Sequence, residues 1–88
     1  MLLDVVTVKP QPDFQLDLTF ENGEQRRFDM RPLLAIKPWN RIASPNLFEH
    51  ARVDYGTVVW PVEIDIAPET LYDDSIPLNR GISGTERG

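Results

Sequence analysis

Residues 14–20 alternate apolar and polar side chains without a break. Because successive side chains of a strand point to opposite faces, this pattern predicts a strand with one buried face. Residues 2–8 are rich in β-branched side chains and predict an earlier strand, which the proline-containing stretch 9–12 ends. The chain is therefore expected to begin with two strands.

The Asn22-Gly23 pair follows the second strand directly and predicts a hairpin. A two-residue loop at this pair would place Phe28 on the polar face of the hairpin. A three-residue loop over residues 21–23 instead sets Leu16 opposite Phe28 and keeps the apolar side chains together. We therefore expect a type I turn and a bulge, with Gly23 in the left-handed conformation.

The third strand is expected over residues 26–30. The same register sets Phe14 opposite Met30, which extends the apolar face to the far end of the hairpin. It also leaves Arg26 on the apolar face near the turn. There its aliphatic stem is expected to lie against the core while the guanidinium reaches water.

Short helices are predicted in the middle of the chain. Asp29 stands at an N-cap position ahead of a helix over residues 30–36. Residues 39–43 are expected to be irregular. Ser44 then caps a second helical turn, with Pro45 at its first position.

A second hairpin is predicted over residues 51–60, with its turn at Gly56. Apolar side chains then keep to alternate positions across residues 58–66, which predicts one continuous apolar face. Pro61 interrupts this stretch and, lacking an N–H group, is expected at a sheet edge or a bulge. Residues 67–72 predict a last helical turn.

These elements predict an α+β fold. We expect a small antiparallel or mixed sheet of about five strands, made of two hairpins and an N-terminal strand, with two or three short helices on one face. A chain of 88 residues rarely supports two independent cores. A single domain is therefore expected over residues 1–76, followed by a flexible C-terminal tail over residues 77–88.

The composition excludes several kinds of site. No cysteine is present, so disulfides, thiolate nucleophiles and cysteine-based zinc sites are ruled out. The N-terminus lacks the features of a signal peptide, and no apolar run approaches the roughly 20 residues of a bilayer-spanning helix. A cytoplasmic protein that does not enter a membrane is expected.

The charges are unevenly distributed around a net charge of -5. Residues 26–52 hold six basic and two acidic side chains, whereas both flanking segments are acidic. One interpretation is that the three segments pack side by side and partly neutralise one another. The other is a basic patch that binds an acidic partner. The negative net charge disfavours non-specific binding to nucleic acid.

The polar side chains do not predict an enzyme or a metal site. His50 is the only histidine and has no cysteine to accompany it. Asp65, Glu69 and Asp73 have four-residue spacing, but they lack a glycine-centred calcium loop and are expected to favour the start of a helix. Glu63 and Asp65 share one strand face and could form an acid–base pair, but no second polar cluster completes a catalytic site around them. No catalytic residue, metal or cofactor is therefore expected.

Three blocks of the chain resemble a known family. They cover residues 18–24 (LTFENGE), residues 28–34 (FDMRPLL) and residues 60–66 (WPVEIDI). In order and spacing they are similar to the small prokaryotic family called domain of unknown function 2442, over roughly the first 75 residues. The resemblance implies a small α+β domain and supplies no catalytic residue.

The same resemblance suggests the kind of function. Single-domain members are often encoded beside another small protein, which implies a two-gene, toxin–antitoxin-like pair. In longer members the domain precedes a DNA-binding helix-turn-helix segment. A second domain is not expected in this chain, so such a contact is not transferred to it.

Our first hypothesis is therefore a non-enzymatic protein-interaction module that binds a small protein partner or a second copy of itself. Tryptophan and arginine are enriched at binding hot spots, so Trp39 is the leading candidate contact if it is exposed. The candidate partner-binding residues are Trp39, Arg41, Arg31 and Arg27. The alternative is a nucleic-acid-associated transcriptional regulator or accessory domain, whose basic segment faces phosphates.

Overall fold

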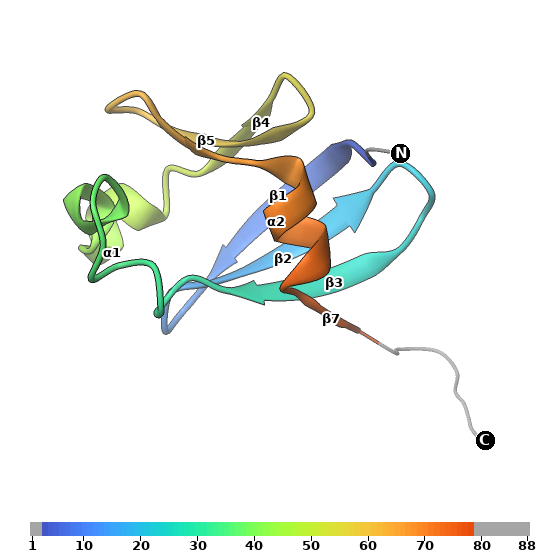
Figure 1. The fold of residues 1–88 in the computed structure, drawn as a ribbon, viewed down its shortest axis with the longest axis horizontal. Coiled ribbons are helices and arrows are strands. Elements are labelled where there is room, and N and C mark those ends of the chain that lie inside the picture. The colour runs from blue at the N-terminus through green and yellow to red at the C-terminus, as the bar shows by residue number, and fades with distance from the viewer. Residues whose placement is uncertain (1–2, 79–88) are drawn as a thin grey trace.

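The computed structural model describes residues 3–78, which form strands and short helices (Figure 1). The strands are β1 (Val5–Gln11), β2 (Gln15–Phe20), β3 (Gln25–Asp29), β4 (Arg52–Asp54), β5 (Thr57–Trp60), β6 (Ile64–Ile66) and β7 (Ile76–Pro77). The helices are the 3₁₀ helix η1 (Trp39–Ile42), α1 (Pro45–Phe48) and α2 (Pro68–Asp73). None of them has the length and apolar character needed to cross a bilayer, within the described residues.

The strands form two antiparallel sheets. One has the order β1-β2-β3-β7 and the other the order β4-β5-β6. In Figure 1 the three-stranded sheet and α2 lie over the same side of the four-stranded sheet, and α1 lies at one end. The α+β class is confirmed, but the prediction of one sheet of about five strands is wrong. The structure has more strands than predicted, because a second turn follows β5 and because β7 forms after α2.

The hairpin of β2 and β3 has the predicted register. Leu16 pairs with Phe28, and the N–H of Met30 donates to the carbonyl of Phe14 at 2.9 Å. Gly23 has a φ of 89°. The three-residue loop is confirmed, because it is the loop that keeps the apolar side chains on one face.

The first strand lies later than expected. It runs to Gln11 and pairs Pro10 with Leu16 of β2. Pro10 fits there because β1 is an edge strand, where a missing N–H need not remove a bond to a neighbour. At the other end, the N–H of Val5 donates to the carbonyl of Gly56 at 2.9 Å, which attaches the β4–β5 turn to β1.

The predicted continuous face over residues 58–66 is divided between two strands. Residues 61–63 form a turn, and Trp60 then pairs with Ile64 in the β5–β6 hairpin. Pro61 therefore lies in a turn, and its expected place at an edge or bulge is wrong. A loop of three residues leaves paired positions an even number apart, so the alternation continues in phase through the turn.

The chain returns to the four-stranded sheet after α2. In β7, Ile76 pairs with Arg27 and Pro77 with Arg26, and the N–H of Leu78 donates to the carbonyl of Gln25 at 2.8 Å. Residues 77 and 78, assigned above to a tail, thus join the sheet edge. The rest of the predicted tail, residues 79–88, lies outside the described residues.

The predicted helix over residues 30–36 does not form. The chain makes consecutive turns there, with the N–H of Leu33 bonded to the carbonyl of Met30 and that of Ile36 to Leu33. Asp29 is instead the last residue of β3, and its Oδ1 accepts the N–H of Arg31 at 3.0 Å. An aspartate that bonds two residues ahead favours a turn over a helix.

Three further local predictions have clear outcomes. The segment expected to be irregular contains the 3₁₀ helix η1. Helix α1 is confirmed, with Pro45 in its first turn and the hydroxyl of Ser44 accepting the N–H of Leu47 at 3.4 Å. Helix α2 is also confirmed and begins at Pro68, but its N-cap residue Ala67 makes no side-chain bond.

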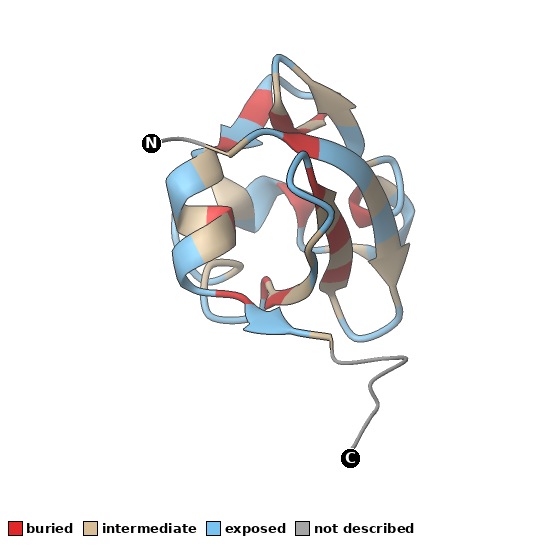
Figure 2. Ribbon diagram, turned by 90° about the vertical axis from the view of Figure 1, so that its right-hand side faces the viewer, coloured by how far each residue is buried: buried red, intermediate tan, exposed pale blue. Residues whose placement is uncertain are grey.

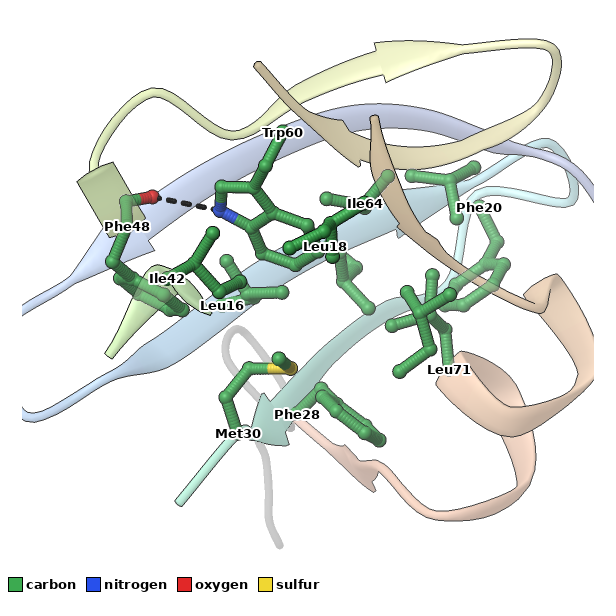
Figure 3. Packing of buried hydrophobic residues seen from close by; sticks show 13 residues of the cluster. Leu16, Leu18, Phe20, Phe28, Met30, Ile42, Phe48, Trp60, Ile64 and Leu71 are labelled. Carbon is green, nitrogen blue, oxygen red and sulfur yellow. Dashed lines mark hydrogen bonds between the residues drawn. The ribbon is translucent and has the colours of Figure 1, made fainter. Parts of the chain in front are cut away.

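One core lies between the two sheets and the helices (Figure 3). Leu16 and Leu18 point into it from β2, opposite Trp60 and Ile64 from the three-stranded sheet, while Leu71 enters from α2. All five side chains are buried. In Figure 2 the residues of β7 are exposed, so this strand extends the sheet without adding to the core.

Candidate functional site

Two of the predicted contact residues are already paired within the chain. Arg27 donates to both carboxylate oxygens of Asp17, at 2.6 and 3.0 Å, from the neighbouring strand. Arg31 makes a two-point contact with Asp29, at 2.9 and 2.8 Å. Arg31 thereby lowers the pKa of the Asp29 carboxyl. The predicted hairpin register already sets Asp17 opposite Arg27, so sequence reasoning had the signal for the first pair.

The other two contact residues lie on η1. Trp39 is half-buried, and its indole N–H donates to the carbonyl of Asp65 at 3.0 Å. Since Asp65 is the middle residue of the edge strand β6, the indole covers part of that edge. Arg41 is exposed and makes no ion pair within residues 3–78.

The four predicted contact residues do not form one cluster. No hydrogen bond, ion pair or ring contact joins any two of them in the part of the chain that the structure describes. Trp39 is half-buried, so part of its ring remains open to a partner. The four residues therefore do not make up a single contact surface.

A polar network joins α2 to the hairpin. Arg26 lies on the core-facing side, as expected. Its guanidinium does not reach water as predicted, because the side chain is largely buried and donates to the hydroxyl of Ser75 at 2.7 Å and to its carbonyl at 2.8 Å. Its guanidinium carbon is 4.4 Å from the centre of the Tyr72 ring, and the hydroxyl of Tyr72 donates to Glu24 at 2.8 Å. The bond from Tyr72 lowers the pKa of Glu24. These side chains satisfy one another and hold α2 in place.

The residues considered for chemistry lie apart. His50 is exposed, and its Nδ1 lies 2.6 Å from the carbonyl of Asn46, to which it donates. Asp65 belongs to β6 whereas Glu69 belongs to α2, so they do not share a helix. Within residues 3–78, no three histidine or acidic side chains lie close enough together to hold a metal ion.

The outward side of the three-stranded sheet carries a row of unlike side chains. Arg52 pairs with Val59, and Val59 pairs with Asp65, so the three lie across neighbouring strands. With the adjoining turn residues Tyr55 and Glu63 they line a shallow hollow of about 300 Å³. We call this surface the three-stranded face. Neither Arg52 nor Asp65 makes an ion pair within the described chain.

Tyr55 is the most unusual residue of the three-stranded face. It is 93 % exposed and has a φ of 54°, followed by Gly56 with a φ of 73°. Two-residue hairpin turns of this kind favour asparagine, aspartate or glycine at their first position. Sequence reasoning found the turn but did not name this tyrosine as a candidate contact residue, although an aromatic residue before the glycine was the available signal.

A second hollow, of about 270 Å³, lies between the β1–β2 turn and α1. We call it the proline–phenylalanine hollow. Its apolar lining is Pro10, Pro12, Phe14, Pro45 and Phe48, and the polar side chains beside them are Gln11, Asp13 and Glu49. Sequence reasoning did not find it, because its two sides are about 30 residues apart in the chain.

A family profile matches residues 5–77, which run from the first residue of β1 to the last of β7. The chain belongs to the DUF2442 family. This is a family of proteins of unknown function, and the match confirms the resemblance inferred from the three sequence blocks. Neither the curated proteins nor the solved structures include a match to the chain. The DUF2442 region contains both hollows, so both surfaces belong to the family domain.

Proposed function

We propose that this DUF2442 domain is a non-enzymatic protein-interaction module and that a small protein partner binds its three-stranded face. The observation that carries the proposal is Tyr55, an exposed aromatic side chain on a backbone conformation that disfavours it. A non-glycine residue with left-handed backbone costs about 1 kcal/mol. The ring recovers none of this through a hydrogen bond or ring contact within the described chain.

The surroundings of Tyr55 support a protein partner. Tyrosine and arginine are enriched at interface hot spots, and Arg52 lies on the same face without an ion pair. Val59 adds apolar area between them, and Trp39 lies at the β6 edge of this face through its bond to Asp65. Aromatic, apolar and charged groups are thus presented side by side.

Binding through side chains is favoured over strand addition. The edge strand β1 contains Pro10, and the edge strand β7 has two residues, one of them Pro77. Proline cannot donate to an added strand, and short edges offer few groups to pair. In the three-stranded sheet the edges are β4 and β6, each of three residues, and Trp39 occupies a carbonyl of β6. Self-association by strand pairing is therefore a weaker proposal than a separate partner.

The partner that the family resemblance suggests is the product of a neighbouring gene, in a two-gene pair in which this chain takes an antitoxin-like part. Nucleic acid is a weaker alternative. The net charge is -5, and Arg26, Arg27 and Arg31 are engaged by carboxylates of the same chain. A phosphate backbone would have to displace those carboxylates.

The test is affinity purification of the tagged protein from its native host, with quantitative mass spectrometry of what accompanies it. Tyr55→Asn is the informative variant, because asparagine tolerates the left-handed conformation while removing the ring. Its melting temperature should be equal to or above that of the unchanged protein. A stoichiometric companion should accompany the unchanged protein and be lost with Tyr55→Asn.

Ile36→Asn is the matched control, since Ile36 is also an exposed apolar side chain but lies in the turns before η1. It should keep the companion. A companion retained by Tyr55→Asn would reject the three-stranded face as its site. A folded protein recovered alone would reject the separate partner, and duplex DNA recovered instead, with binding that weakens steeply in salt, would favour the nucleic-acid alternative.

A further inference from the structure

We infer that the proline–phenylalanine hollow binds a lysine or arginine side chain presented by an extended segment of a protein partner. This goes beyond the proposed function, because the hollow has no lining residue in common with the three-stranded face. The two surfaces can therefore be tested separately.

The size of the hollow fits a side chain. Small-molecule sites usually enclose about 300–1,000 Å³. The hollow measures about 270 Å³ and opens between a turn and a single-turn helix. A long, flexible side chain fits into such a space.

The floor of the hollow is fixed to the core. The rings of Phe14 and Phe48 meet edge to face with their centres 5.2 Å apart, and Phe48 lies 6.0 Å from Trp60. Trp60 also donates its indole N–H to the carbonyl of Phe48 at 3.0 Å, the bond drawn in Figure 3. Aromatic surface held in this way needs little ordering when a side chain arrives.

The walls are equally restricted. Pro10, Pro12 and Pro45 have ring-constrained backbones, so they lose little freedom on binding. Between them, Asp13 and Phe14 both have left-handed backbone, with φ of 66° and 60°. Strained backbone of this kind is often found at ligand clamps, where the surrounding structure holds it.

The charge beside the hollow selects the occupant. Asp13 and Glu49 are exposed and make no ion pair within residues 3–78. Arg31 is close enough for Asp13 to raise the pKa of its guanidinium, but Asp29 already binds that guanidinium on two atoms. The site therefore has an excess of negative charge.

A basic side chain satisfies both parts of the site. Lysine and arginine have an aliphatic stem that packs on apolar surface and a charged end that stays at the polar rim. The stem would contact the prolines and the half-buried ring of Phe14, and the cation would lie at the rim beside the carboxylates of Asp13 and Glu49. A purely apolar side chain would leave the two carboxylates without a partner.

The experiment uses two matched peptides, Ac-Gly-Ala-Arg-Ala-Gly-amide and the same peptide with citrulline, which keeps the shape of arginine without its charge. Each is titrated into the ¹⁵N-labelled full chain and followed by NMR. With the arginine peptide, amide shifts should change at residues 11, 13, 14 and 46–49, with a dissociation constant on the order of 1 mM. The citrulline peptide should bind at least about tenfold more weakly.

Two isosteric variants test the rim. Asp13→Asn keeps a residue that tolerates left-handed backbone, and Glu49→Gln keeps the side-chain volume, so both should give folded spectra. Each variant should raise the dissociation constant of the arginine peptide by about fivefold. Tyr55→Asn should leave peptide binding unchanged, so failure of this inference and failure of the three-stranded face are distinguishable.

Three outcomes would overturn the inference. Equal binding of the arginine and citrulline peptides would show that charge does not select the occupant. Shift changes at the three-stranded face, with none at the hollow, would place the basic site elsewhere. An arginine peptide that causes no change up to about 10 mM would show that the hollow does not bind this side chain.

Discussion

Trp39 and Trp60 make the same hydrogen bond in different surroundings. Each indole N–H donates to a backbone carbonyl at 3.0 Å, Trp39 to Asp65 at the molecular surface and Trp60 to Phe48 inside the core. Only the buried carbonyl is out of reach of water. The free-energy value of the two bonds should therefore differ, although their geometry is alike.

Replacing each tryptophan with phenylalanine tests this difference. Trp60→Phe should lower the free energy of unfolding by about 2–4 kcal/mol, because it leaves a cavity and an unsatisfied buried carbonyl. Trp39→Phe should cost less than about 1 kcal/mol, since water replaces the indole N–H. Urea denaturation measures both. Equal losses in the two variants would contradict the role assigned to burial.

The stability cost at Tyr55 also belongs to a single residue. Its φ of 54° should make Tyr55→Asn more stable than the unchanged protein by up to about 1 kcal/mol. For a domain of this size that corresponds to a rise in melting temperature of about 4–8 °C. A fall in melting temperature would mean that the ring stabilises the free chain, and the main support for the three-stranded face would be lost.

At the scale of elements, polar groups help to attach α2 and β7 to the β2–β3 hairpin, in addition to the buried side chain of Leu71. Arg26 holds Ser75, and Tyr72 holds Glu24. The edge-to-face contact of Tyr72 with Phe20, at 5.2 Å between ring centres, adds apolar area. This attachment should depend on pH, because the bond from Tyr72, followed by that from Asn22, holds the pKa of Glu24 below its ordinary value.

The sign of that dependence follows from the direction of the pKa. The folded chain keeps Glu24 ionised to lower pH than the unfolded chain does, so its contribution is complete above the unfolded pKa and is lost as pH falls through the folded pKa. The free energy of unfolding should therefore decrease from about pH 5 to about pH 3, and the decrease should be smaller in Glu24→Gln. Part of the decrease should remain in Glu24→Gln, because Arg31 also lowers the pKa of Asp29.

The measurement is urea denaturation at a series of pH values. Glu69→Gln is a control with the same change of charge, placed on α2 outside the network. It should keep the slope of the unchanged protein. Identical slopes in Glu24→Gln and the unchanged protein would contradict a role for this carboxylate in holding α2.

At the scale of the whole molecule, the two sheets share one core. Leu18 from the four-stranded sheet and Ile64 from the three-stranded sheet belong to the same buried cluster. The bond from Val5 to Gly56 also ties the sheets together at one end. Neither sheet has a separate apolar core, so neither should remain folded without the other.

Coincident unfolding transitions would test this cooperativity. In Trp39→Phe, fluorescence reports on Trp60 alone and therefore on the packing between the sheets. The fluorescence transition and the far-ultraviolet circular dichroism transition should have the same midpoint in urea. An earlier fluorescence midpoint would show that the three-stranded sheet detaches while the four-stranded sheet persists.

The sequence by itself determined the local features of this protein. The β2–β3 register, the conformation of Gly23 and the cap of α1 each depend on side chains a few residues apart, so a short stretch of sequence is sufficient. The family could also be inferred, because its blocks are continuous stretches. The helix expected at residues 30–36 was wrong for a related reason, since the turn formed by Asp29 uses the same residue type as a helix cap.

Only the tertiary structure decided how the strands divide into sheets and which surfaces are open. The alternation over residues 58–66 is the same for one long strand and for a hairpin with a three-residue turn, so packing on the core makes the choice. The pairing of β7 with β3 joins residues about 50 positions apart, and no local pattern encodes such a contact. The exposure of Tyr55 and the hollow beside Phe14 likewise arise where distant segments meet, because the area left open depends on every element packed around it.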